Sequence, residues 1–263
     1  MTACDTHIHV YDGQYPAAPG AVLRPPDAGL DDYAELQAVT GTERVVMVQP
    51  TTYGLDNTLH LDAMARIGDA ARGVMVVDAD TDRAELERLT ERGVRGARFH
   101  LLPGGAVDLD QLTVVAARIA PLGWHVQLQL DGHRLAGLLD RLLRLPCPLV
   151  IDHVGRFMPP VAPDTAPFSA LLSLVDAGAH VKLSAPYESA PDPDHRYDLV
   201  TACVDELVRR APDRLLWASN WPHPGQADPP SPVRLVELRD RWLPTAELRR
   251  QVLVDNPATC YDF

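Results

Sequence analysis

Two histidines separated by a single residue, His7 and His9, lie in the segment 5–10 near the start of the chain. On a β-strand they would project from the same face, because successive side chains alternate sides. An imidazole can bind a metal ion, or it can transfer protons near neutral pH. The pair therefore predicts either a metal centre or two acid/base groups beside one substrate.

Polar side chains also stand near the end of other short apolar segments. They are Gln49, Asp78, Arg98, His100, Gln127, Gln129, Asp152, His153, Lys182, Ser184 and Asn220. Burying this many separate polar groups is costly unless they share one hydrated site. We therefore expect the segments that carry them to meet at one end of the molecule.

Eight apolar or β-branched runs would carry these residues as strands, with helical patterns between them. The runs cover 5–10, 44–49, 73–78, 96–101, 125–130, 149–153, 180–184 and 215–220. The helical segments include 81–93, with Thr81 as N-cap, and also 110–122 and 198–210. This alternation predicts an α/β fold, a single-domain (β/α)8 TIM barrel over residues 1–263, whose active site lies at the C-terminal ends of the strands. A doubly wound open sheet is the alternative, but no G-x-G-x-x-G motif follows the first run.

The composition narrows the classes of function. A net charge of −12 argues against nucleic-acid binding, which needs clustered basic residues. No apolar run approaches the ~18 residues of a membrane span, and the N-terminus does not resemble a secretory signal. Cysteines at 4, 147, 203 and 260 form no CxxC motif, which favours reduced thiols and a cytoplasmic location.

Four motifs together resemble the amidohydrolase superfamily. They are Asp-Thr-His-Ile-His at 5–9, Arg98 after Val-Arg-Gly, Ile-Asp-His-Val-Gly-Arg at 151–156 and Trp-Ala-Ser-Asn-Trp-Pro-His-Pro at 217–224. Within the superfamily, they are similar to its lactone-processing branch, which contains 2-pyrone-4,6-dicarboxylate lactonases and D-galactarolactone isomerases. The resemblance extends from the first strand to Pro257, nearly the whole chain.

The resemblance bears directly on a metal. It implies His7, His9 and His153 as ligands, but the fifth run offers Gln127 and Gln129 in place of histidine, and the eighth ends in Asn220 in place of aspartate. The branch is generally metal-independent, so we expect no cofactor. The alternative is a zinc site formed by the three histidines.

Without a metal, His7, His9 and His153 are expected to transfer protons as catalytic groups. Asn220 cannot accept a proton, so its amide would position water or an oxyanion. We expect Asp152 to face outward against a helix. The remaining histidines are expected to be structural or solvent-exposed; they are His60, His100, His125, His133, His180, His195 and His223.

The predicted substrate is a small anionic lactone, because three cations would lie near the mouth of a strongly acidic protein. Arginine binds a carboxylate through two parallel hydrogen bonds. The residues assigned to substrate binding are Arg98, Arg156, Lys182, Gln49, Thr51, Asn57, Gln129 and Tyr187.

Two reactions remain open. His7 favours ring-opening hydrolysis of a carboxylate-bearing lactone, because the resembled lactonases carry histidine at this position and the isomerases tend to carry glutamine. Asn220 and the loops 102–107, 187–189 and 220–223 favour a lactone isomerase, in which a substrate hydroxyl replaces water. A catalytically weakened barrel that only binds a small anion is a further alternative, although three convergent histidines favour an enzyme.

Overall fold

Eight parallel strands form a nearly closed barrel in the computed structural model, which describes residues 2–189, 192, 194 and 196–263. The strands are β1 (Cys4–Ile8), β2 (Arg44–Val48), β3 (Ala71–Met75), β4 (Val94–His100), β5 (His125–Gln129), β6 (Leu149–Ile151), β7 (His180–Leu183) and β8 (Leu215–Trp217). Each pairs with the next in chain order, and Trp221 after β8 pairs with Ile8. The predicted (β/α)8 barrel is confirmed.

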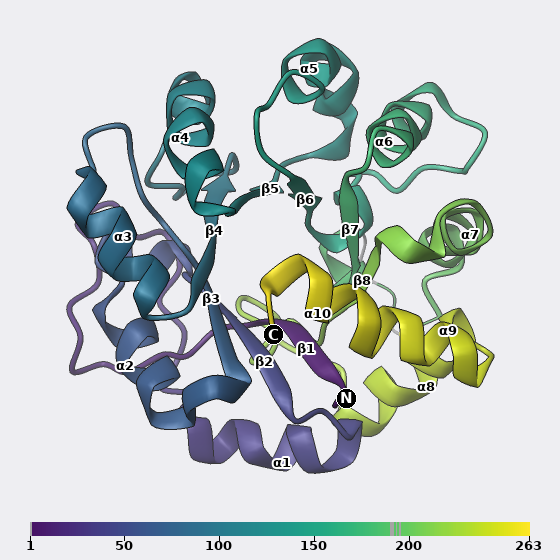
Figure 1. The fold of residues 1–263 in the computed structure, drawn as a ribbon. Coiled ribbons are helices and arrows are strands. Elements are labelled where there is room, and N and C mark those ends of the chain that lie inside the picture. Colours follow the sequence, from purple (N-terminus) through teal and green to yellow (C-terminus); the bar gives the residue numbers. More distant parts are fainter. Residues whose placement is uncertain (1, 190–191, 193, 195) are drawn as a thin grey trace.

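Helices surround the strands (Figure 1). They are α1 (Leu30–Thr40), α2 (Thr58–Ile67), α3 (Arg83–Glu91), α4 (Leu112–Ile119), α5 (Leu135–Leu142), α6 (Ala166–Asp176), α7 (Asp198–Arg210), α8 (Pro232–Trp242), α9 (Ala246–Arg250) and α10 (Asn256–Tyr261). Short 3-10 turns η1 (Thr51–Tyr53), η6 (His153–Gly155) and η7 (Pro186–Glu188) follow β2, β6 and β7. No helix in the described part of the chain is both long and apolar enough to cross a bilayer.

The predicted strands are correct in number and order, but all eight end one to three residues too late. Residues 218–220 leave the ladder after Trp217, and Asn220 has a φ of 62°. The predicted Thr81 cap is wrong: Asp82 caps α3 by accepting a hydrogen bond from the Glu85 amide, while the Thr81 hydroxyl bonds Asp78. The predicted helix 198–210 is confirmed as α7.

The base of the barrel is covered by the C-terminal segment. Arg72 at the start of β3 donates to the main-chain oxygen of Asp262, and the Phe263 ring lies beneath Arg44 and Arg72. Figure 1 accordingly shows α10 and the C-terminus over the centre of the barrel. The opposite end, where the strands terminate, is left for the functional site.

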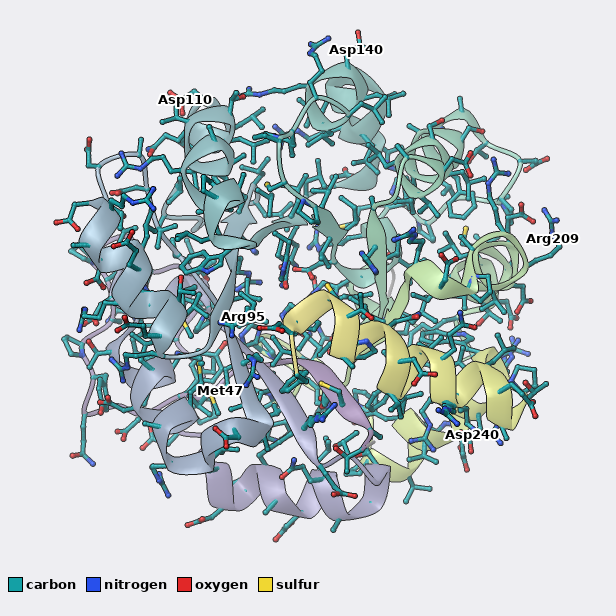
Figure 2. All side chains as sticks on the ribbon, in the orientation of Figure 1. Met47, Arg95, Asp110, Asp140, Arg209 and Asp240 are labelled. Atoms are coloured by element: carbon teal, nitrogen blue, oxygen red, sulfur yellow. The ribbon has the colours of Figure 1, made fainter. Side chains whose placement is uncertain are left out.

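Most charged side chains lie on the outside of this fold. Asp110, Asp140, Arg209 and Asp240 are exposed and stand at the periphery in Figure 2, whereas Met47 of β2 is fully buried. The acidic surface therefore belongs to the helices, and the polar groups of the strand ends form a separate set inside the barrel.

Candidate active site

A cleft of about 220 Å³ opens at the C-terminal ends of the strands. It brings together seven of the predicted site residues: His9, Thr51, Arg98, Gln129, His153, Arg156 and Asn220. These side chains come from the ends of β1, β2, β4, β5, β6 and β8, or from the turns directly after them. The barrel mouth is therefore the place where the predicted chemistry converges.

The backbone at this mouth is unusual. His153, Arg156 and Asn220 have φ values of 54°, 47° and 62°, in the left-handed region that side chains other than glycine rarely adopt. Each such residue costs on the order of 1–3 kcal/mol, and such residues cluster at functional sites. The turns thus aim side chains in directions that an extended strand would not give.

His7 and His9 lie in contact through their Nε2 atoms, which are 3.3 Å apart. His9 Nδ1 bonds the main-chain oxygen of Val48 at 2.7 Å. Burial holds the pKa of both imidazoles well below the ordinary value, so both are neutral at pH 7. Only His9 lines the cleft; His7 is fully buried behind it.

His153 is the histidine best placed to exchange protons with a ligand. Its Nδ1 pairs with the Ser184 hydroxyl at 2.8 Å, and its ring lies 4.9 Å from that of His7. Its Nε2 makes no hydrogen bond with the described residues. Burial lowers the pKa of His153 well below its ordinary value, which leaves a neutral ring able to accept a proton.

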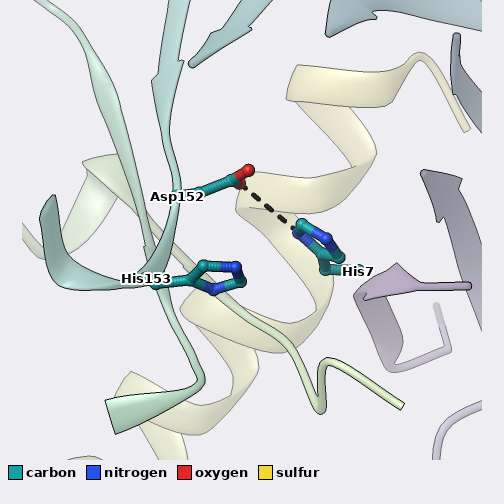
Figure 3. A group of neighbouring side chains, drawn as sticks. All are labelled: His7, Asp152 and His153. Carbon is teal, nitrogen blue, oxygen red and sulfur yellow. Dashed lines mark ion pairs between the residues drawn. The ribbon is translucent and has the colours of Figure 1, made fainter. Parts of the chain in front are cut away.

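Asp152 was predicted to face outward, and this prediction is wrong. Its Oδ1 lies 3.4 Å from His7 Nδ1, an ion pair that Figure 3 marks with a dashed line. Its Oδ2 accepts a hydrogen bond from Gln127. Adjacent residues point to opposite sides only along an extended strand. Because His153 is left-handed, Asp152 and His153 both reach the barrel interior.

Lys182 lies in the interior beneath the histidines and does not line the cleft. Its Nζ donates to Thr6 O and to Gln127 Oε1, both at 2.7 Å, and lies 3.4 Å from His7 Nδ1 and 3.8 Å from Asp152 Oδ1. Burial lowers the pKa of this ammonium to about 8, so it remains mainly protonated at pH 7. Lys182 was predicted to bind the substrate, but the structure places its ammonium beside His7 instead.

Two arginines face the cleft in different electrostatic settings. Arg98 donates to Gln49 O and to Gln129 Oε1, and its Nε has no partner among the described residues. Arg156 donates from Nε to Glu188 Oε2 at 2.8 Å, with both side chains less than a fifth exposed. Arg98 is thus a free buried charge, whereas Arg156 is already paired.

Asn220 belongs to a hydrogen-bonded chain with Tyr187 and His223. Asn220 Nδ2 donates to the Tyr187 hydroxyl at 2.9 Å, and that hydroxyl lies 2.8 Å from His223 Nδ1. Burial lowers the pKa of His223 to about 4, so its ring is neutral and its Nδ1 can accept a hydrogen bond from the Tyr187 hydroxyl. Asn220 Oδ1 is left without a partner among the described residues, and Asn220 lines the cleft.

Besides Lys182, three predicted substrate contacts lie outside the main cleft. Gln49 and Asn57 hold the loop after β2, since Gln49 donates to Asp56 O and Asn57 exchanges two hydrogen bonds with Val76. Tyr187 acts behind Asn220. Polar loop residues cannot be divided from sequence into those that bind the loop and those that bind a ligand.

Two cleft residues escaped the prediction of function. His100, expected to be structural or exposed, lines the cleft, and its Nδ1 lies 3.2 Å from Gln129 Oε1. Its position two residues after Arg98 on the same strand was the available signal. Glu188 also lines the cleft, but nothing in the sequence marks its pairing with Arg156. His195 lies outside the described residues.

The cluster of His7, Asp152 and His153 could in principle hold a metal, because one ligand atom from each lies within 4.8 Å of the others. The predicted set of metal ligands was His7, His9 and His153, so Asp152 takes the place of His9 in this cluster. One carboxylate and two imidazoles suit zinc in ligand type. The charge does not fit, because the Lys182 ammonium lies within 4 Å of His7 Nδ1 and Asp152 Oδ1.

A protein-family model described as Amidohydrolase matches residues 4–263. D-galactarolactone isomerase of Agrobacterium fabrum is 37% identical over 265 residues, which cover 98% of this chain and 90% of that protein. 2-Pyrone-4,6-dicarboxylate hydrolase of Comamonas testosteroni is 36% identical over 274 residues, with coverages of 98% and 90%. An apo crystal structure from Agrobacterium tumefaciens has a TM-score of 0.93 at 37% identity and covers 100% of this chain and 96% of its own.

Both curated relatives are enzymes, and the prediction of an enzyme is confirmed at this level. The fold, the order of the motifs and the family match agree over the same residues. The chain therefore belongs to the amidohydrolase family, and its predicted resemblance to the lactone-processing members is confirmed.

Proposed function

We propose that this protein is a metal-independent hydrolase that opens the ring of a carboxylate-bearing lactone. One observation supports this most strongly: neutral His153, whose Nε2 has no hydrogen-bond partner among the described residues, belongs to a cleft that also holds Arg98, Arg156 and Asn220. Ester hydrolysis needs a base, a polarising group and an anchor for the substrate. These four residues supply each of them.

The proposed reaction begins with the lactone carboxylate on Arg156 and its carbonyl oxygen near the guanidinium of Arg98. A water molecule donates one hydrogen bond to Asn220 Oδ1 and gives its other proton to His153 Nε2 as its oxygen attacks the carbonyl carbon. Arg98 stabilises the negative oxygen of the tetrahedral intermediate. The ring C–O bond then breaks, and His153 returns the proton to the leaving alkoxide, which yields a hydroxy acid.

Asn220 defines the second candidate, a lactone isomerase. Its unpaired Oδ1 can accept a hydrogen bond from a substrate hydroxyl as well as from water. In that reaction His153 deprotonates the hydroxyl, which attacks the carbonyl and forms a lactone of different ring size. The relative from Agrobacterium fabrum, a D-galactarolactone isomerase, supports this candidate.

Nuclear magnetic resonance of freshly prepared galactarolactones and glucarolactones with metal-stripped enzyme separates the candidates. Accumulation of open-chain diacid supports hydrolysis, whereas a new lactone without diacid supports the isomerase. Unchanged lactone, with turnover restored only by Zn²⁺, would contradict a metal-independent reaction of either kind.

We also propose a cytoplasmic location, since all four cysteines are free thiols. The partner that the site supports is the small anionic lactone itself.

A further inference from the structure

Lysine occurs once in this chain. Of its 24 lysine and arginine residues, Lys182 is the single lysine, and its side chain is fully buried inside the barrel. Arginine carries a wide planar guanidinium, whereas lysine carries a compact charge with three donors. The chain therefore uses the compact cation only beneath the histidines of the site.

The three donors of this ammonium have three acceptors. Thr6 O and Gln127 Oε1 lie at 2.7 Å, and His7 Nδ1 lies at 3.4 Å. The same Gln127 donates from Nε2 to Asp152 Oδ2 at 3.1 Å. The glutamine thus holds the ammonium and the carboxylate beside each other, with His7 next to both.

The proton on each imidazole follows from these contacts. The Val48 carbonyl can only accept, so His9 carries its proton on Nδ1 and presents a bare Nε2 to His7. His7 must then carry its proton on Nε2 to donate across the 3.3 Å contact. Its bare Nδ1 is left to accept from Lys182.

The opposite tautomer of His7 would create a different site. With its proton on Nδ1, directed at Asp152, His7 would place a bare Nε2 opposite the bare Nε2 of His9. Two nitrogens that bind one tetrahedral zinc ion stand roughly 3.3 Å apart, given Zn–N bonds of about 2.0–2.1 Å. In this structure Asp152 Oδ1 has no hydrogen-bond partner among the described residues, so the second arrangement is not formed.

We propose that Lys182 is a positioning residue with two linked effects. Its ammonium keeps His7 in the Nε2–H tautomer, and its charge, 3.8 Å from Asp152 Oδ1, keeps a divalent metal out of the cluster of His7, Asp152 and His153. The inference rests on the proposed metal-independent function. The tests below use no substrate. The role of Lys182 can therefore be contradicted while the proposed reaction stands, and the proposed reaction can be contradicted while the role of Lys182 stands.

The first test uses the wild-type protein labelled with ¹⁵N in its histidines. The ring nitrogen shifts of His7, assigned by comparison with a His7→Gln variant, are expected to show a protonated Nε2 and a bare Nδ1. Those of His9 are expected to show the reverse. A proton on Nδ1 of His7 would overturn the proposal, whatever the behaviour of any variant.

The second test compares zinc uptake by wild type and Lys182→Met, which keeps the length and loses the charge. Removing a unit charge about 4 Å from the ligands is expected to tighten zinc binding by ~100-fold or more. The control is Lys182→Met/Asp152→Asn, which lacks the carboxylate ligand and is expected to lose that gain. The measurement is calorimetric titration with ZnCl₂, with bound metal confirmed by elemental analysis.

Equal zinc affinity in wild type and Lys182→Met would overturn the exclusion of metal by Lys182. A gain that persists in the double variant would also overturn it, since the ion would then bind elsewhere. Where Lys182→Met does not fold, zinc titration of the wild type decides instead. Stoichiometric tight binding there contradicts the proposal, and its absence at micromolar zinc supports it.

Discussion

At the scale of single residues, His153 bears most of the proposed chemistry. Replacing it with glutamine removes a proton acceptor but keeps a polar side chain of similar size, so turnover of the lactone is expected to fall by ~10²-fold or more. The matched control is His133→Gln, since His133 pairs with Asp131 and does not line the cleft. Steady-state kinetics on both variants measures the effect, and near-normal turnover in His153→Gln would remove it from the mechanism.

Glu188 gives a prediction about the charge of the substrate. It occupies Nε of Arg156 and offsets part of its charge, so that guanidinium keeps its remaining N–H groups for one substrate carboxylate while Arg98 serves the carbonyl oxygen, which suits a lactone with one carboxylate. Glu188→Gln is expected to raise affinity for a dicarboxylate lactone by ~10-fold relative to a monocarboxylate lactone. Competition binding with 2-pyrone-4,6-dicarboxylate and galactarolactone measures the ratio.

The control for this change is Glu87→Gln, because Glu87 pairs with Arg83 on the exposed face of α3. An unchanged preference in Glu188→Gln would show that Glu188 does not set the charge that the cleft accepts. A change of equal size in Glu87→Gln would point to the overall charge of the protein instead.

Much of this site could be predicted from residue types, and the reasons for the failures are specific. His9, Arg98 and His153 were correctly placed at the mouth, because polar groups at strand ends must share a hydrated site. Asp152 was misplaced because alternation fails where His153 is left-handed. Lys182 was assigned to the substrate because sequence does not reveal how deep a long side chain lies.

At the scale of elements, the strands were predicted well because both faces of a parallel barrel are buried and select continuous apolar runs. Their ends were less accurate, and the residues directly after β3, β4, β5 and β8 are apolar and continue the run. The cap of α3 shows the same limit. Thr81 and Asp82 are both good caps, and only the fold shows that Thr81 is used by Asp78.

This cap yields a stability prediction. Asp82→Ala removes the acceptor of the Glu85 amide and is expected to cost about 1 kcal/mol, with no effect on turnover. For a protein of this size, that loss corresponds to a decrease of roughly 2–4 °C in Tm. Differential scanning calorimetry checks it, with Asp80→Ala as an exposed control on the same loop. Equal Tm values for both variants would contradict the assigned cap.

At the scale of the whole molecule, buried histidines make the fold sensitive to acid. Burial lowers the pKa of His60 and His125 to about 3 and that of His180 to about 4. Below pH 6.5 the unfolded chain binds protons at these sites and the native protein does not, so stability falls as pH falls. Burial raises the pKa of Asp5 to about 6, so this group alone makes the protein more stable as pH falls toward 4. The buried histidines outnumber it, so their effect on stability is larger.

The free energy of unfolding is therefore expected to be lower at pH 5 than at pH 7, by about 1.4 kcal/mol per pH unit for each such histidine. Urea denaturation at the two pH values measures it. His125→Phe removes one titrating group and is expected to reduce the slope by about one proton. A free energy that does not change with pH would show that these histidines are protonated in the native state.

The proposed metal independence of the lactone chemistry is a property of the whole barrel. Its most direct test is the kcat/KM of one enzyme preparation on its lactone substrate, before and after chelator treatment, with metal content measured in parallel. The same kcat/KM is expected when bound metal has fallen far below one ion per chain. A loss of activity that follows the metal, and returns with Zn²⁺, would contradict it.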